Sequence, residues 1–399
     1  MFGITKRPKR LDKELPLIKY HGFFRKQINM FQGVALIVGL TIGAGVLGIP
    51  YAVAKVGLLI GLGYIVGLGI LMIGLNLMVG EIAVRTKGNL QLSGLSKKYL
   101  GNWGEVIMTT IKFTAVAGVM VIYIIGEGQT LSALFGGSAY AWSLIFFLTG
   151  SCLIYVGLKS IRVIDFVLSL GILFVVVLIA GFSAPHLHLA NYQYVNFARL
   201  LLPYGVILFA YHGGSAVIEA HTILANRNKT FKYTIIIAGI ISIITYSLFA
   251  FVVLGVSGVH TTEIATIGLG NQVGSYMLIF GNVFAVMAMA TSFLTIGLST
   301  RDSLTWDYKI PTQVSALVTC MVPLVVFLLG LRQFIMAINI VGGIFISLEM
   351  LLIILIYWKA KQKGDLDPGK YKLHHTLLLA ILLIFALAVG AMYSVLKLF

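Results

Sequence analysis

Hydrophobic and polar positions fall into long blocks in this chain: apolar segments bounded by charged residues recur from Met30 to Leu398. Each block is close to the ~20 residues with which an α-helix crosses the ~30 Å hydrocarbon layer of a membrane. Backbone polar groups in lipid must find partners within the protein, so such blocks are expected to be helices. The pattern predicts an all-α integral membrane protein of about eleven transmembrane helices. The predicted spans are residues 30–55, 57–83, 104–127, 139–157, 162–182, 199–225, 231–257, 275–300, 311–330, 332–358 and 376–398.

Composition agrees with this prediction. Of the 399 residues, 59% are hydrophobic and 11% are charged, which is more apolar surface than a soluble domain of this length can bury. Cys152 and Cys320 both lie inside apolar blocks, so we expect them to pack there rather than form a disulfide framework or a metal site. The polar and basic residues 1–29 precede a first span that is too long and too rich in glycine for a cleavable signal peptide. They are predicted to form a cytoplasmic tail.

The formal net charge of +16 is explained by topology rather than by nucleic-acid binding. Of the 29 Lys and Arg residues, 24 fall in the N-terminal tail and in every second loop. The positive-inside rule then predicts a cytoplasmic N-terminus and an external C-terminus in a prokaryotic-type inner membrane. Basic residues on the cytoplasmic side also favour contact with anionic membrane lipid. An even number of spans would mix the basic and non-basic loops, so the asymmetry favours eleven.

Two spans carry clustered glycines near their middle. The first reads Thr41-Ile42-Gly43-Ala44-Gly45, and the sixth reads Tyr211-His212-Gly213-Gly214. Glycine disfavours helix by about 1 kcal/mol relative to alanine, so these clusters predict local unwinding. Close helix packing through small residues is the alternative interpretation. Paired interruptions in two halves of opposite orientation indicate the binding site of a transporter, where freed N–H groups attract a carboxylate and freed carbonyls attract an ammonium group.

Three stretches resemble a known family of transporters. The segment from Thr41 to Pro50 resembles the first helix of the bacterial aromatic amino-acid permeases and of the amino acid/auxin permeases, within the amino acid-polyamine-organocation group. The stretch from Phe209 to Gly213 is similar to their sixth helix, and the stretch from Thr291 to Leu298 to their eighth. The resemblance implies a LeuT-type fold: a five-helix repeat at residues 30–182, an inverted repeat at 199–358, and an extra C-terminal helix at 376–398.

The same resemblance implies a substrate site. Backbone near Gly43 would bind the substrate carboxylate, carbonyls near Ala210 would bind its amino group, and Tyr123 and Ser292 would line the side-chain pocket. The predicted substrate-binding residues are Thr41, Gly43, Ala44, Gly45, Tyr123, Phe209, Ala210, Tyr211, His212, Gly213 and Ser292.

The coupling ion has two candidates, and no other cofactor is expected. Thr291 and Ser292 share a helix face with Ala288, and with first-helix carbonyls near Gly39 and Ile42 they would form a sodium site. Alternatively, the two hydroxyls bond back to their own helix. Ionisable residues inside spans are candidates for proton coupling, and His212 and Glu349 are the strongest.

These observations predict a secondary active transporter that moves amino acids by alternating access, driven by sodium or protons. The expected partners are an amino-acid substrate and membrane lipid, with no nucleic acid. A LeuT-fold sensor or receptor subunit that binds without transport is the alternative. The sequence has no phosphate-binding loop and no cluster of nucleophile and base, so we do not expect an enzyme.

Overall fold

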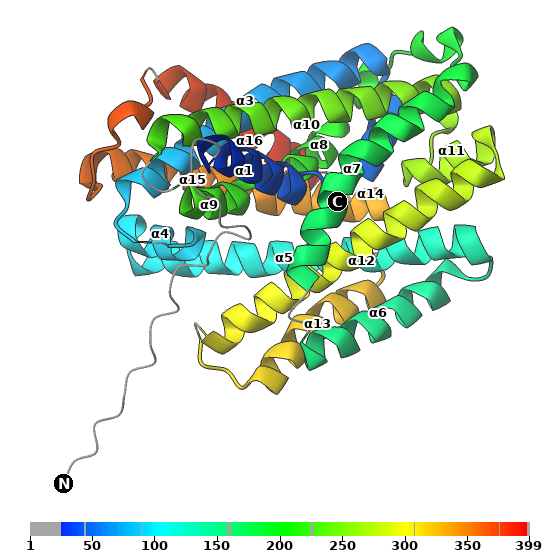
Figure 1. Cartoon of the computed structure of the whole chain (residues 1–399). Coiled ribbons are helices and arrows are strands. Elements are labelled where there is room, and N and C mark those ends of the chain that lie inside the picture. Colours follow the sequence, from blue (N-terminus) through cyan, green and yellow to red (C-terminus); the bar gives the residue numbers. More distant parts are fainter. Residues whose placement is uncertain are drawn as a thin grey trace.

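The structure is a computed structural model that describes residues 25–396, except 44, 89, 158–160, 225–226, 307 and 375. Most of the predicted cytoplasmic tail lies outside the described residues, as does Ala44. The described chain is helical throughout (Figure 1). Its α-helices are α1 (Arg25–Thr41), α2 (Gly45–Val56), α3 (Leu58–Arg85), α4 (Leu92–Leu100), α5 (Asn102–Phe135), α6 (Ala139–Val156), α7 (Ile161–Ser183), α8 (Pro203–Ala210), α9 (Gly214–Ile223), α10 (Asn228–Ser257), α11 (Ala265–Val273), α12 (Ser275–Trp306), α13 (Thr312–Leu328), α14 (Phe334–Ile340), α15 (Ser347–Lys363) and α16 (Thr376–Leu396). The short elements are the 3-10 turns η1 (Ala184–His186), η2 (Leu189–Tyr192), η3 (Phe197–Arg199), η4 (Gly258–His260) and η6 (Gly369–Tyr371), and the π-helix η5 (Val341–Ile346).

The predicted spans coincide with observed helices. Within the described residues, seven helices are long and apolar enough to cross a membrane, and the bent pair α1–α2 brings the number to eight. The predicted fifth, sixth and ninth spans correspond to α7, to the pair α8 and α9, and to α13. The all-helical membrane fold is therefore confirmed, whereas the count of eleven spans and the two repeat boundaries stay predictions.

Three features depart from simple straight spans. The predicted loop after the second span contains the helix α4, and the predicted loop after the seventh span, residues 258–274, contains η4 and α11. The predicted tenth span is continuous but changes to π-helix over η5 before α15 begins. A π-helical turn inside an α-helix is common at functional sites, and hydrophobic periodicity does not reveal it.

The interrupted helices lie among the other helices of the bundle. α2 packs on α8, α1 packs on α9, and α10 contacts both α1 and α2 (Figure 1). The π-helix η5 packs on α8 at Gly205 and Gly342, where a Cβ on Gly342 would overlap with the Gly205 backbone. These contacts hold both interruptions inside the protein, which is where irregular backbone at membrane depth is tolerated.

One end of the molecule is tied together by buried polar groups. The fully buried Glu81 on α3 accepts hydrogen bonds from Arg85 (2.8 Å), from the Tyr357 hydroxyl on α15 (3.1 Å) and from the Leu373 backbone N–H (3.0 Å). The ion pair with Arg85 and these hydrogen bonds offset the free-energy cost of burying the carboxylate. The network joins α3, α15 and the segment that leads into α16.

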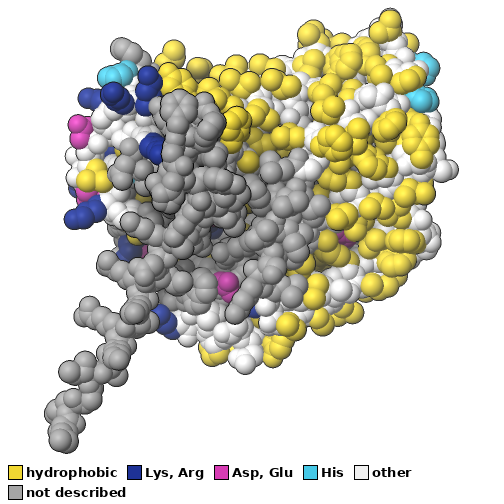
Figure 2. Space-filling model, viewed as in Figure 1, with side chains coloured by type: hydrophobic (Ala, Val, Ile, Leu, Met, Phe, Trp, Pro, Cys, Tyr) yellow, Lys and Arg dark blue, Asp and Glu magenta, His cyan; other side chains and the backbone are white. Residues whose placement is uncertain are grey.

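The surface separates charge from apolar side chains. Lys and Arg side chains gather at the end of the molecule near η6 and α4, whereas its broad flank is hydrophobic (Figure 2). Large apolar side chains are strongly exposed on several spans, including Leu148, Phe174 and Leu377. An apolar belt of this extent is expected where helices face lipid.

Candidate functional site at two helix interruptions

Both spans with clustered glycines are interrupted. α1 ends at Thr41 and α2 begins at Gly45, and these helices are bent by 59° relative to each other. α8 ends at Ala210 and α9 begins at Gly214. We call residues 42–44 the first break and residues 211–213 the second break. Each break leaves carbonyls at the end of one half-helix and N–H groups at the start of the next, so it presents both ends of a helix dipole inside the protein.

The two breaks face each other closely. A Cβ atom on Gly45 would lie only 2.8 Å from the Cα of Ala210 and 3.0 Å from the Cδ1 of Phe209. A Cβ atom on Gly213 would overlap with the Oγ1 of Thr41. Glycine is therefore required at both positions by the approach of neighbouring atoms. The structure brings together five of the predicted substrate-binding residues.

Tyr246 on α10 joins the two breaks. Its hydroxyl lies 2.6 Å from the carbonyl oxygen of Ala210 and 3.1 Å from that of Thr41, the last residues of α8 and α1. A hydroxyl has one hydrogen, so the two carbonyls share it or receive it alternately. Tyr246 is not among the site residues predicted from the sequence. The available signal was a tyrosine in the middle of an apolar span, because a buried tyrosine hydroxyl usually needs a partner.

The predicted pocket tyrosines point to different places. Tyr123 on α5 is buried, and its hydroxyl lies 3.8 Å from the position of a Cβ on Gly43. It therefore lies beside the first break. Tyr211 instead donates its hydroxyl to the Ile65 carbonyl on α3 at 2.9 Å, and its ring packs edge-on against Tyr246. In this structure the Tyr211 side chain anchors the second break to the bundle.

The hydroxyl of Thr41 has no partner at this junction. Its Oγ1 atom is buried and forms no hydrogen bond with another described residue. Leaving a buried polar group unsatisfied costs about 1–3 kcal/mol. A polar ligand between the breaks would remove this cost.

His212 connects the second break to α15. Its Nε2 lies 3.2 Å from the Oε1 of Glu349, and the side chains of the two residues are 30% and 2% exposed. Glu349 lies in the first turn of α15, which follows the π-helix η5, and the charge of Lys112 on α5 also acts on its carboxyl group. The two predicted proton-coupling residues thus form one partly buried pair.

The predicted sodium residues are divided between α1 and α12. Gly39, Ile42 and Ala288 are buried, and Ser292 is partly buried. The Thr291 hydroxyl donates to the carbonyls of Met287 (2.9 Å) and Ala288 (3.2 Å) in its own helix. Its oxygen lone pairs remain able to accept a cation, so this geometry leaves the sodium site a prediction. Among the described residues, no group of three His, Cys, Asp or Glu side chains could hold a metal ion.

Two curated relatives resemble the chain over most of their length. A protein of Haemophilus influenzae described as "Tyrosine-specific transport system 1" is 24% identical over 370 residues, which cover 84% of this chain and 89% of that protein. A protein of Aliivibrio fischeri described as "Glutamine transporter 2" is 23% identical and covers 89% of this chain and 98% of its own. Both relatives are named as transport proteins.

Solved structures support the fold. The crystal structure of MhsT in complex with L-phenylalanine superposes with a TM-score of 0.65 at 12% identity, over 94% of this chain and 99% of that one. A manganese transporter of Eremococcus coleocola gives a TM-score of 0.69, also at 12% identity, over 94% and 88% of the two chains. These likenesses show the LeuT-type fold alone. The sequence model of the tryptophan/tyrosine permease family matches residues 26–394, and the chain is therefore a multi-pass member of that family of amino-acid transporters.

Proposed function

We propose that this protein is a secondary active transporter that carries a neutral L-amino acid across the inner membrane by alternating access, driven by protons. The observation that carries the proposal is the meeting of the two breaks, where Tyr246 bridges the carbonyls of Thr41 and Ala210. The unpartnered Thr41 hydroxyl at the same place supports a polar ligand there. We also propose that the chain is related to the wider group of amino acid/auxin permeases.

The breaks supply groups for both ends of a zwitterion. The first N–H groups of α2, at Gly45, form a positive helix end that suits a carboxylate. The Ala210 and Thr41 carbonyls form negative ends that suit an ammonium group. Each carbonyl oxygen has two lone pairs, so it can accept from Tyr246 and from a substrate together.

The substrate side chain would lie beside Tyr123 and Phe209. Tyr123 faces the first break from α5, and Phe209 contacts Gly45 from α8. Aromatic rings on two sides favour a large neutral side chain. The family is named for tryptophan and tyrosine, and the name of one relative adds glutamine. L-tyrosine is therefore the first substrate to test, followed by L-tryptophan, L-phenylalanine and L-glutamine.

A proton is the ion that we propose for coupling. His212 lies in the second break and Glu349 is buried beside it at 3.2 Å, so a change in the break would change the environment of an ionisable pair. Intramembrane ionisable residues are functional candidates by default. Sodium at Thr291 and Ser292 is the alternative ion. The distribution of basic residues places the N-terminus inside and the C-terminus outside in this proposal.

Uptake into proteoliposomes tests the proposal directly. Purified protein is given the four labelled amino acids, with a proton gradient and a sodium gradient imposed separately. We expect concentrative uptake under the proton gradient. Concentrative uptake under sodium alone would reject the proton pair, and saturable binding without uptake under either gradient would reject transport in favour of a sensor.

A further inference from the structure

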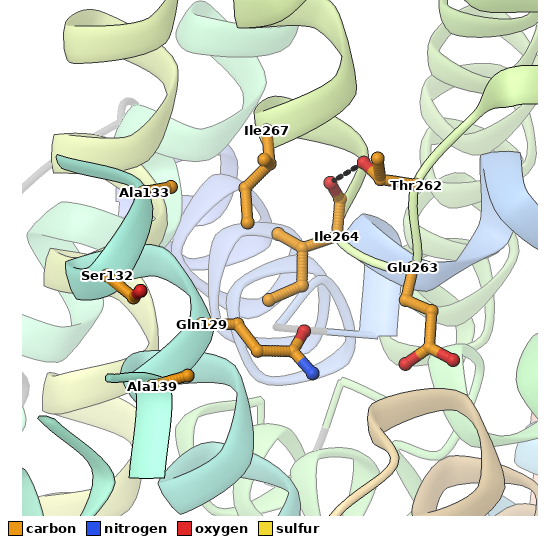
Figure 3. A pocket seen from close by; sticks show the side chains of 8 residues that line it. All are labelled: Gln129, Ser132, Ala133, Ala139, Thr262, Glu263, Ile264 and Ile267. Carbon is orange, nitrogen blue, oxygen red and sulfur yellow. Dashed lines mark hydrogen bonds between the residues drawn. The ribbon is translucent and has the colours of Figure 1, made fainter. Parts of the chain in front are cut away.

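A cavity of about 400 Å³ lies at the end of α5 that is opposite to the Glu81 network (Figure 3). It is open on one side, and α5, the start of α6, α11 and the segment before α11 form its walls. Gln129 and Ser132 come from α5, and Glu263, Ile264 and Ile267 come from the opposite wall. None of these residues belongs to the breaks, so this cavity is separate from the site described above. Its size is within the range of small-molecule sites.

Two polar groups in the cavity are left without partners. The Ser132 hydroxyl donates to the Gly137 carbonyl, and the Thr262 hydroxyl donates to the Ile264 carbonyl. Glu263 accepts one hydrogen bond on Oε2, from the Ile335 N–H at the start of α14 (3.4 Å). Its Oε1 atom and the Gln129 amide form no hydrogen bond with another described residue. Figure 3 shows these two side chains reaching into the cavity from opposite walls.

Glu263 also stands out by its charge. It is the only acidic residue in the loops predicted to face outside, which otherwise carry Lys55, Arg199 and Arg332. Arg332 is engaged with the Tyr140 ring at 4.7 Å, and Lys55 with the Tyr51 ring at 4.8 Å. The Glu263 carboxylate can attract a positively charged group, and Ile264 and Ile267 beside it provide an apolar wall.

We propose that this cavity is an outer binding site for an amino acid, with Glu263 as the counter-charge of the α-ammonium group. The Gln129 amide oxygen is its second acceptor, and Ile264 and Ile267 contact the substrate side chain. The proposal rests on the proposed function and deepens it, because it adds a site that the substrate occupies before it reaches the breaks. Since Glu263 also holds the N-terminus of α14, an ammonium bound there competes with that contact.

Kinetics give the first test. Glu263→Gln keeps the shape and removes the charge, so the KM for L-tyrosine should rise about tenfold while kcat stays within about twofold. Glu105→Gln is the matched control, because Glu105 is a partly exposed acid that pairs with Lys97 at the other end of α5. An unchanged KM in Glu263→Gln would overturn the proposal. If the wild-type protein takes up no amino acid at all, it is the proposed function that fails instead.

Chemical protection gives the second test. Ser132→Cys is introduced into a protein in which Cys152 and Cys320 are replaced by alanine, and a membrane-impermeant maleimide labels it. L-tyrosine should slow this labelling, whereas the same compound without its amino group should not. The protection should persist when Gly45→Ala closes the inner site. Loss of protection in that variant would show that it came from the breaks, and absence of protection in both would equally reject the outer site.

Discussion

The two breaks are similar in position but differ in what their residues do. The described residues of the first break, Ile42 and Gly43, have no ionisable side chain. Gly43 lies beside Tyr123, and Gly45, directly after the break, approaches α8 through its backbone. The second break carries Tyr211 and His212, and both side chains are fastened to helices distant in sequence, at Ile65 and Glu349. The difference indicates a division of labour. In the proposed mechanism, the first break supplies a binding surface of backbone groups, and the second connects that surface to α3 and α15.

Tyr246 is the element common to both breaks. Because it bonds one carbonyl from each, a displacement of either half-helix changes the hydrogen bond to the other. A ligand that replaces one of these bonds would therefore bias the position of both half-helices. Such a bistable connection is what coupling between binding and conformational change requires.

Closing the gap between the breaks should have the largest effect. In Gly45→Ala the new methyl group meets the Ala210 backbone at 2.8 Å, and backbone in a helix cannot move aside cheaply. Misplacing the site by about 1 Å can cost about 100-fold in rate, so uptake of L-tyrosine should fall by at least that factor. Gly63→Ala on α3 is the control, since no atom lies within 4 Å of that Cβ, and it should transport normally. Normal uptake by a monodisperse Gly45→Ala protein would show that the breaks do not form the site.

Removing the charge of Glu349, beside the second break, should leave substrate binding intact and abolish coupling to the proton gradient. In Glu349→Gln the hydrogen bond to His212 can persist while the acid is lost. We expect exchange of internal for external amino acid to continue, whereas accumulation driven by a proton gradient falls to a ratio of about one. The measurement is proteoliposome uptake with and without the gradient, in parallel with counterflow. Undiminished proton-driven accumulation would show that Glu349 does not carry the coupling proton.

The sequence predicted the breaks because glycine clusters act locally. Helix propensity and small-residue spacing are properties of a few neighbouring residues, and those at Gly43–Gly45 and Gly213–Gly214 were enough to locate both interruptions. The sequence could not predict the pairing of His212 with Glu349, because 137 residues separate them and only the packing of α15 brings them together. For the same reason, the sequence did not show that Tyr246 bridges the two breaks or that Tyr123 and Tyr211 point to different places. Side-chain direction depends on helix rotation within the bundle, which hydrophobic patterns specify poorly when most faces are apolar.

Loss of the hydroxyl that joins the breaks should have an intermediate effect. Tyr246→Phe keeps the buried ring and removes hydrogen bonds to two carbonyls. Two buried carbonyls then lose their donor. Because one such hydrogen bond contributes about 1 kcal/mol or more, we expect uptake to become about tenfold slower. Tyr276→Phe is the matched control, because Tyr276 is 56% exposed on α12. Equal rates in the two variants would mean that the bridge is dispensable for transport.

The smallest effect on uptake is expected at Tyr211. A substitution there distinguishes a side chain that stabilises the fold from one that binds substrate. Its hydroxyl bonds the Ile65 carbonyl on α3 rather than pointing toward Tyr123 and the first break. Tyr211→Phe should therefore lower the free energy of unfolding by about 1 kcal/mol while the KM for L-tyrosine stays within about twofold. Thermal unfolding in detergent and uptake kinetics measure the two quantities, with Tyr123→Phe as the variant in which KM should rise instead. If KM rises only in Tyr211→Phe, the second break binds substrate through its side chains, and the division of labour between the breaks is reversed.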